Sequence, residues 1–158
     1  NEAHAHLGKQ FAERKVEKKY WALVWGKPLE KLICDGAIGR HPVQRKKMAV
    51  IPNGRPSLTL VERKSFFEEG YSFIECDLKT GRTHQIRVHA AHIGHPIAGD
   101  EKYGDKEANK KLSSQFGLKR LFLHAASMQF ALNDGQTPYV LNAPLAPDLN
   151  EVLNKLND

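Results

Sequence analysis

The amino-acid sequence predicts an α+β fold in which a mixed, mostly antiparallel sheet is flanked by helices. Two observations favour this class: strand-like segments follow one another through hairpin turns, and only a few segments have helical spacing. The 158 residues contain 41% hydrophobic and 27% charged residues, which is ordinary for a globular protein. No repeat, low-complexity tract or interdomain linker is visible. We therefore expect a single domain over residues 1–158.

The first part of the chain is predicted to hold one helix and then strands. Glu2 to Arg14 has apolar residues at four-residue spacing, which is typical of an amphipathic helix. Lys18 to Trp25 is rich in aromatic and β-branched residues and ends at Gly-Lys-Pro, so we expect a strand. A hairpin-like region follows, with strands at 29–33 and 48–51 and a turn near Asp35-Gly36.

The middle and end of the chain continue the same pattern. Segments 57–67 and 71–78, joined at Glu69-Gly70, are predicted to form an antiparallel pair. The elements expected after residue 94 are a loop at 94–104, a helix at 106–116 capped by Asp105, strands at 121–132 and 139–142 around a turn at 133–135, and a final helix capped by Asp148. The final helix is the clearest, because its four apolar residues fall at i, i+3, i+4 and i+7: Leu149, Val152, Leu153 and Leu156.

The stretch Thr80 to His89 reads Thr-Gly-Arg-Thr-His-Gln-Ile-Arg-Val-His and opens a short helix after a strand. Thr83 is expected to cap this helix and Gly94 to end it. The apolar side of the helix holds three residues, Ile86, Ala90 and Ile93. His84 and Arg87 lie on the opposite side. A strand, turn and helix that bury one face and carry cations on the other predict an anion-binding site.

Charge and cysteine content indicate the kind of partner and the cellular compartment. The formal net charge is +6 and the pI is about 9.3, which favours a polyanionic partner. Cys34 and Cys76 lack the paired spacing of a metal site, so a reduced, cytoplasmic setting is the simplest interpretation. No apolar run approaches the roughly 18 residues of a membrane span, and no signal peptide is visible. We expect no association with a membrane.

The string Thr80 to Arg87 resembles the Thr-Gly-Arg-Thr-His-Gln-Ile-Arg motif of the RluA-type family of RNA pseudouridine synthases. Further motifs follow the family's order: Lys18-Lys19-Tyr20, Gly54 to Thr59, Gly94 to Asp100, Tyr103-Gly104 and Arg120 to Ala125. The resemblance extends over nearly the whole chain, and the nearest subgroup is the ribosomal large-subunit pseudouridine synthase C type. It implies the pseudouridine synthase catalytic fold. It also implies isomerisation of uridines in RNA, chiefly large-subunit ribosomal RNA, without a cofactor.

The chain departs from the family pattern at one point. The family's nucleophilic aspartate lies in a motif resembling Arg-Leu-Asp-x-x-Thr-Ser-Gly, upstream of Lys-x-Tyr, and no aspartate here has that context. Asp100 belongs to a loop in the family pattern, so we do not assign it as the catalyst. We therefore expect the chain to be the C-terminal portion of a catalytic domain and inactive alone. Its N-terminal side would be missing or supplied as an N-terminal fragment of the same protein.

The resemblance implies catalytic roles for Tyr20, Lys18 and Arg87. Tyr20 would stack on the flipped uracil and relay a proton, although its sequence pattern alone favours a core aromatic. Lys18, on the same strand face, would help this tyrosine to ionise. Arg87 is expected to hold the missing aspartate, because a guanidinium pairs bidentately with a carboxylate; without it, Arg87 would be a half-buried unpaired cation. Leu123 would border the base, with a plain core leucine as the alternative.

Contacts with the RNA are expected at two places. Arg82 and His84 would touch the RNA backbone or stabilise their own loop. The basic loop 40–47 is a candidate RNA contact through Arg40, Arg45 and Lys46, and a solvated charged surface is an equal alternative. A target nucleotide must leave its stack at a cost of a few kcal/mol, which phosphate contacts help to offset.

Two other functions are alternatives to an RNA pseudouridine synthase. Four histidines raise the possibility of a metallo-hydrolase: His84, His89, His92 and His95. Their spacings of five, three and three, with no carboxylate between them, do not fit a zinc helix, so we expect no metal. The second alternative is a non-catalytic RNA-binding module, which the basic charge and aromatic residues permit. No RNP, KH or C₂H₂ pattern supports it.

Overall fold

The architecture comes from a computed structural model that describes residues 17–130 and 139–157. Within these residues six strands form one antiparallel sheet, two form a separate hairpin, and three segments are helical. The elements are β1 (Glu17–Trp25), β2 (Lys31–Cys34), β3 (Ile38–Arg40), β4 (Met48–Val50), β5 (Thr59–Phe67), β6 (Tyr71–Leu78), α2 (Gln85–His92), α3 (Lys106–Phe116), β7 (Leu123–Phe130), β8 (Tyr139–Asn142) and α4 (Pro147–Asn157). The predicted α+β class is confirmed.

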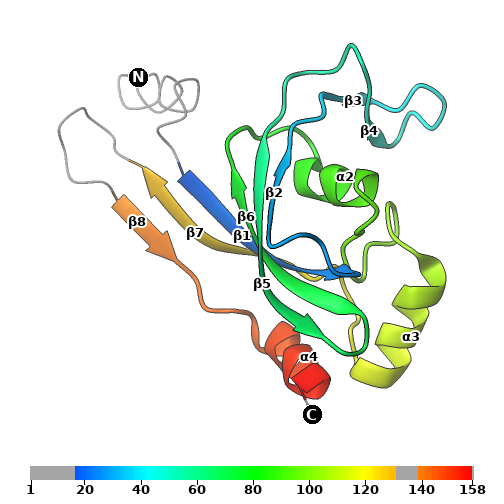
Figure 1. Ribbon diagram of the computed structural model, residues 1–158, viewed down its shortest axis with the longest axis vertical. Coiled ribbons are helices and arrows are strands. Elements are labelled where there is room, and N and C mark those ends of the chain that lie inside the picture. The colour runs from blue at the N-terminus through cyan, green and yellow to red at the C-terminus, as the bar shows by residue number, and fades with distance from the viewer. Residues whose placement is uncertain (1–16, 131–138, 158) are drawn as a thin grey trace.

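The six-stranded sheet has the order β2-β5-β6-β1-β7-β8, with β1 near its centre (Figure 1). The predicted strands at 18–25, 57–67 and 71–78 are β1, β5 and β6, and the last two pair antiparallel as expected. Successive side chains of β1 point to opposite faces. Ala22 and Val24 therefore enter one apolar cluster, whereas Leu23 enters another on the other face.

Helices cover the two clusters differently. The first cluster includes Ile86 and Ala90 of α2, whereas the second includes Leu112 of α3 and Leu149 and Val152 of α4. Figure 1 shows α2 beside the β3–β4 hairpin and shows α3 and α4 towards the other end of the molecule. Each leucine or valine buried in this way contributes roughly 1.5–3 kcal/mol. Packing on the sheet therefore fixes where α2 presents its polar residues.

The predicted hairpin between 29–33 and 48–51 is wrong. β2 pairs with β5, with Lys31 opposite Glu62, whereas β4 pairs with β3, a strand absent from the sequence prediction. Ile38 of β3 is 1% exposed, and its backbone packs so closely on Gly54 that a Cβ there would lie 2.7 Å from it. Most of the predicted basic loop 40–47 is a loop: Arg40 is the last residue of β3, and residues 41–47 connect β3 to β4.

α2 ends as predicted but begins differently. The Gly94 N–H donates to the Ala91 carbonyl and the His95 N–H to the Ala90 carbonyl, with Gly94 at φ +82°. This is the Schellman arrangement that a glycine permits. Thr83, by contrast, is not the cap. The N-cap is His84, at φ +55°, and no side chain caps the first turn.

The N-caps predicted for α3 and α4 have different outcomes. Asp105 caps α3 as predicted, because its carboxylate accepts a hydrogen bond from the Ala108 N–H. Asp148 does not precede α4, since the helix begins at Pro147, and its carboxylate pairs with Arg120 instead. The expected helix at 2–14 and turn at 133–135 lie outside the described residues. None of the described helices is long and apolar enough to cross a membrane.

Candidate active site

The turn before α2 is built around the buried amide of Gln85. Its Oε1 accepts hydrogen bonds from the Thr80 hydroxyl at 2.7 Å and the Arg82 N–H at 3.0 Å. Its Nε2 donates to the Leu58 carbonyl and to the Thr59 hydroxyl, both at 2.9 Å. All four hydrogen-bonding positions of the amide are thus used, which buried polar groups require. Gln85 therefore fixes the 80–84 turn against β5.

His84 sits in the left-handed region, which is uncommon for a residue with a side chain. Its Nδ1 lies 2.8 Å from the Tyr103 hydroxyl, which also accepts a hydrogen bond from the Met48 N–H at 2.9 Å. Since the Met48 amide only donates, the phenol oxygen accepts that hydrogen bond and its hydrogen remains available to His84 Nδ1. Burial, followed by the charges of Arg87 and Lys102, lowers the pKa of His84. The imidazole is therefore neutral near pH 7.

Arg87 projects from the side of α2 that faces away from the first apolar cluster. Its Nε donates to Asp100 Oδ2 and its Nη2 to Asp100 Oδ1, both at 2.9 Å. The guanidinium carbon lies 5.1 Å from the centre of the Tyr103 ring. The expectation that Arg87 has no carboxylate partner within this chain is therefore wrong. Nη1 makes no hydrogen bond within residues 17–130 and 139–157, so one edge of the fork is open.

Asp100 is fully buried, and several donors hold its charge. Burial opposes ionisation, but hydrogen bonds from Arg87 and from the backbone N–H groups of Tyr103 and Lys102 outweigh it and lower the pKa of Asp100. Its side chain is 0% exposed against 20% for Arg87. Asn109 also donates to the Asp100 carbonyl at 2.9 Å. Asp100 is thus a structural anchor that aims the guanidinium.

Tyr20 and Lys18 lie on β1, on the face of the sheet covered by α2. Tyr20 packs against the first apolar cluster, which contains Ile86 of α2. Lys18 and Tyr20 also line a groove of about 170 Å³ beside β7 and β8. The Lys18 ammonium reaches to 3.8 Å from the position of a Cβ at Gly81, and burial lowers the pKa of Lys18. The structure therefore brings Lys18 to the turn that opens α2.

Tyr20 and Leu123 lie on the face of the sheet that α2 covers, and Arg87 projects from α2 itself. Leu123 is partly buried on the same cluster as Tyr20, opposite Ala22 in the strand register. Among the described residues, no hydrogen bond or ion pair joins Tyr20 to Arg87. The site roles of Lys18, Tyr20, Leu123 and Arg87 remain predictions: Tyr20 and Leu123 lie on the first apolar cluster, whereas Arg87 is paired with Asp100.

The basic loop is a compact, exposed turn. The His41 Nδ1 accepts hydrogen bonds from two backbone N–H groups, and Arg40 Nη1 donates to the Arg45 carbonyl at 2.7 Å. Arg45 and Lys46 are exposed. Tyr103 ties the end of the loop to α2 through Met48, a link across 55 residues that the sequence analysis missed. Its only signal was the Tyr103-Gly104 motif, to which no role was given.

Arg82 and the histidines have defined partners. Arg82 Nε donates to the Pro56 carbonyl at 2.9 Å, which places Arg82 at the turn that precedes β5. His89 contacts Thr59 and Gly36, and His95 contacts the Trp25 carbonyl. Among the described residues, no group of three or more histidine, cysteine, aspartate or glutamate side chains is arranged to hold a metal.

Comparison with known proteins gives the site its context. A family model described as RNA pseudouridylate synthase matches residues 1–92. Ribosomal large subunit pseudouridine synthase C of Vibrio cholerae is 40% identical over 152 residues, covering 96% of this chain and 47% of that protein. A protein of Chloroflexus aurantiacus named uncharacterized RNA pseudouridine synthase is 42% identical over 158 residues, covering 100% of this chain and 48% of that protein.

A solved structure agrees with these sequence matches. Human RNA pseudouridylate synthase domain containing 1 superposes with a TM-score of 0.75 at 27% identity, covering 94% of this chain and 63% of that one. The chain spans about half the length of the curated relatives it matches. Since the family model covers more than half of the residues and the relative from Vibrio cholerae is 40% identical over 96% of this chain, the chain belongs to the RNA pseudouridylate synthase family.

Proposed function

We propose that this chain forms the arginine and tyrosine side of an active site that isomerises uridine to pseudouridine in large-subunit ribosomal RNA. The observation that carries the proposal is the Arg87 guanidinium, which Asp100 and Tyr103 hold with Nη1 open. The relative from Vibrio cholerae is named as a ribosomal large subunit pseudouridine synthase, which supports the choice of RNA. Both cysteines are free and buried, which suits a cytoplasmic setting.

The reaction moves one bond without a change of oxidation state. The N1–C1′ glycosidic bond breaks, the base turns, and a C5–C1′ bond forms; the C5 proton leaves and N1 gains a proton. Arg87 would keep a nucleophilic aspartate ionised and aimed at C1′, because Nη1 can donate to a second carboxylate. That aspartate is not among the 158 residues in its family context, so we propose that the chain alone does not catalyse.

Tyr20 would stack on the flipped uracil and take part in the proton transfer. Its position beside an open groove with Lys18 supports this role, since a base entering the groove would meet both side chains. Lys18, which lines the same groove, would place a positive charge beside the ring. Leu123 would border the base from β7.

The RNA contacts would extend from the site to the β3–β4 hairpin. Arg40, Arg45 and Lys46 carry exposed charges on a loop that Tyr103 fixes beside His84. Arg82 lies in the turn that leads into α2. Such contacts position the phosphate backbone without reading the sequence.

Release of tritium from C5 of labelled uridine in ribosomal RNA tests the proposal, since C5 loses its hydrogen in the reaction. We expect no release by the 158-residue chain, and release when the whole protein or a segment bearing the aspartate is supplied. Release by the chain alone would disprove the need for that segment. A whole protein that binds RNA without releasing tritium would instead indicate a non-catalytic RNA-binding module.

A further inference from the structure

We infer that a groove along α3 is a second binding surface for the phosphate backbone of RNA, separate from the basic loop and from Arg87. The inference rests on the proposed RNA substrate. The groove has a volume of about 750 Å³ and lies between α3 and the segments around Gly99 and Arg120. It is open to solvent.

Positive charge dominates the lining of this groove. Lys106, Lys110, Lys119 and Arg120 face one carboxylate, that of Glu101. Arg120 is bound to Asp148, with Nε–Oδ2 at 2.7 Å, but Lys106 and Lys110 form no ion pair with any carboxylate of the described residues. These two ammonium groups are therefore available to an anion from outside.

The spacing of the two lysines favours a chain of phosphates over a single ion. Lys106 and Lys110 are four residues apart on α3, which is about 6 Å along the helix axis. Like charges at this spacing repel each other, so the helix alone gains nothing from the pair. A strand of phosphates crossing the groove would relieve that repulsion at both lysines.

Neutral donors and a fixed cation complete the surface. Ser113 and Ser114 lie about one turn beyond Lys110 and also line the groove, although the Ser114 hydroxyl already donates to the Lys111 carbonyl. The Lys119 ammonium donates to the Ser113 carbonyl at 3.2 Å and to its hydroxyl at 2.7 Å. Lys119 is thus held in place at the end of the groove, where it adds charge without losing further side-chain freedom.

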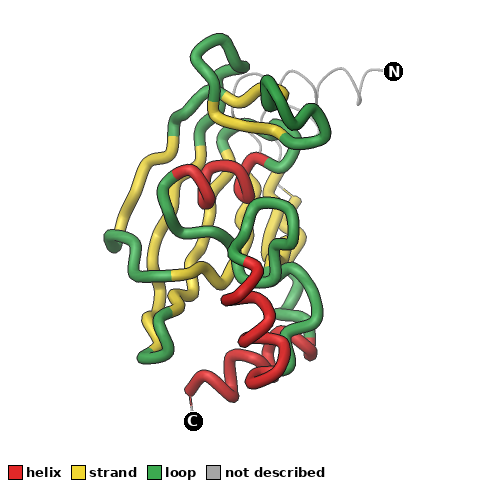
Figure 2. Tube along the Cα trace, turned by 90° about the vertical axis from the view of Figure 1, so that its right-hand side faces the viewer, coloured by secondary structure: helices red, strands yellow, loops and turns green. Residues whose placement is uncertain are grey.

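The groove is joined to the candidate active site through one stretch of backbone. Asn109, which lines the groove, accepts a hydrogen bond from the Gly99 N–H and donates to the Asp100 carbonyl. The Asp100 carboxylate holds Arg87. Figure 2 shows the β3–β4 hairpin, α2 and α3 following one another along the side of the molecule that faces the viewer. Arg87 and the groove are thus linked through the Gly99–Asp100 backbone, so an RNA strand held at Arg87 would lie near the groove.

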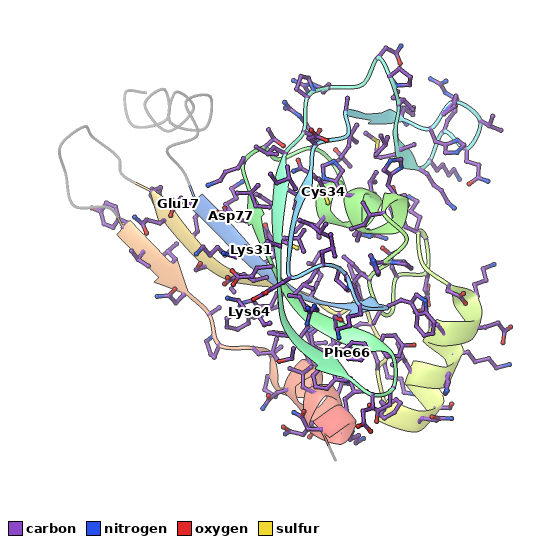
Figure 3. The ribbon with its side chains drawn as sticks, viewed as in Figure 1. Glu17, Lys31, Cys34, Lys64, Phe66 and Asp77 are labelled. Carbon is purple, nitrogen blue, oxygen red and sulfur yellow. The ribbon has the colours of Figure 1, made fainter. Side chains whose placement is uncertain are left out.

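The test compares two charge-matched double variants of the full 158-residue chain. Lys106→Gln with Lys110→Gln removes the groove charges. Lys31→Gln with Lys64→Gln removes two exposed lysines on β2 and β5, away from α3 (Figure 3). Binding of a fluorescein-labelled uridine-containing hairpin RNA is measured over a series of KCl concentrations. Circular dichroism and thermal unfolding confirm that both variants are folded.

We expect the groove variant to lower the slope of log K against log salt by about 1.4, and to weaken binding about 25-fold at 0.1 M salt, because each phosphate contact on a single strand contributes about 0.7. The control variant should change neither quantity comparably. Equal effects of the two variants, or a groove variant with wild-type slope and affinity, would overturn the inference. Neither result would contradict the proposed catalysis, which tritium release in the whole protein tests separately.

Two more outcomes are decisive. If the wild-type chain binds no RNA, the groove inference fails together with the proposed RNA contacts of this chain. If the groove variant keeps its RNA affinity but loses binding to vesicles of phosphatidylserine and phosphatidylcholine, the surface serves lipid, and the inference is wrong.

Discussion

Arg87 and Asp100 form a two-bond ion pair, Nε–Oδ2 and Nη2–Oδ1, in which the carboxylate is fully buried and the guanidinium keeps one edge open. Removing one partner of a buried pair leaves an uncompensated charge. Removing both avoids that penalty. The pair therefore allows the stability of the site and its chemistry to be separated by mutation.

Arg87→Gln is expected to lower the free energy of unfolding by about 3–5 kcal/mol, because the Asp100 charge stays buried without its partner. Arg87→Gln combined with Asp100→Asn should lose less than the sum of the two single changes. Urea denaturation measures both. In the whole protein the double variant should be folded and inactive, since Nη1 is gone.

An exposed ion pair on the surface is a matched control for Arg87→Gln. Arg120 and Asp148 have the same two-bond geometry, at 2.7 and 3.2 Å, but both side chains are exposed. Arg120→Gln should therefore hardly change stability, since water screens an exposed pair. Equal losses for Arg87→Gln and Arg120→Gln would show that burial of Asp100 does not matter.

Tyr103→Phe is expected to weaken RNA binding more than it slows the chemical step. The variant keeps the ring beneath Arg87 but leaves the Met48 N–H and His84 Nδ1 without their partner, which costs about 1–2 kcal/mol. The basic loop then loses its link to α2, so in the whole protein KM for RNA should rise while kcat changes little. Tyr139→Phe, on the exposed β8 strand, is the control. A fall in kcat alone would contradict this role.

The strands of the sheet could be predicted because their residues alternate or cluster in ways that a sheet requires. β1, β5 and β6 are examples. β3 could not be predicted. Its three residues, Ile38-Gly39-Arg40, follow Asp35-Gly36 closely, and the whole stretch looks like a turn. It becomes a strand because Gly54 lets a distant backbone approach Ile38 closely, a contact that no local pattern reports.

In the candidate active site, too, one part could be predicted from the sequence and another could not. The motif identified Arg87 and placed it on the polar side of α2, because helical spacing fixes which residues share a side. Its partner could not be predicted, since Asp100 reaches Arg87 only through the path of the 94–104 loop. That path depends on hydrogen bonds from Asn109 of α3 to the Asp100 carbonyl and from the Ala98 N–H to the Leu23 carbonyl of β1, which are different elements.

Two glycines with the same backbone angle allow strain and steric overlap to be separated. Gly94 and Gly99 both have φ +82°, but a Cβ at Gly94 meets nothing within 4 Å, whereas one at Gly99 overlaps the Arg120 carbonyl. Gly94→Ala should therefore cost only the left-handed penalty, about 1–2 kcal/mol. Gly99→Ala should cost clearly more and displace Asp100 from Arg87. Chemical denaturation measures both, and equal losses would contradict the overlap.

His89 is expected to make the fold sensitive to mild acid. Its Nε2 faces the Gly36 carbonyl at 2.8 Å and therefore carries the proton, so its Nδ1 accepts from the Thr59 hydroxyl, also at 2.8 Å. Burial, only partly opposed by the hydrogen bond to Gly36, lowers the pKa of His89. Protonation would give His89 a second N–H, at Nδ1. This donor would face the Thr59 oxygen, which already accepts a hydrogen bond from Gln85.

Because the pKa is lower in the folded protein than in the unfolded chain, the unfolded chain binds more protons as the pH falls below about 6.5. Stability should therefore be constant above that pH and fall by up to about 1.4 kcal/mol per pH unit below it. His89→Gln should be less stable at pH 7.5 but lose less between pH 7 and 5, although His84 contributes in the same direction in both proteins. Urea midpoints across this range measure the difference. Parallel pH profiles for the two proteins would show that the buried imidazole is not the titrating group.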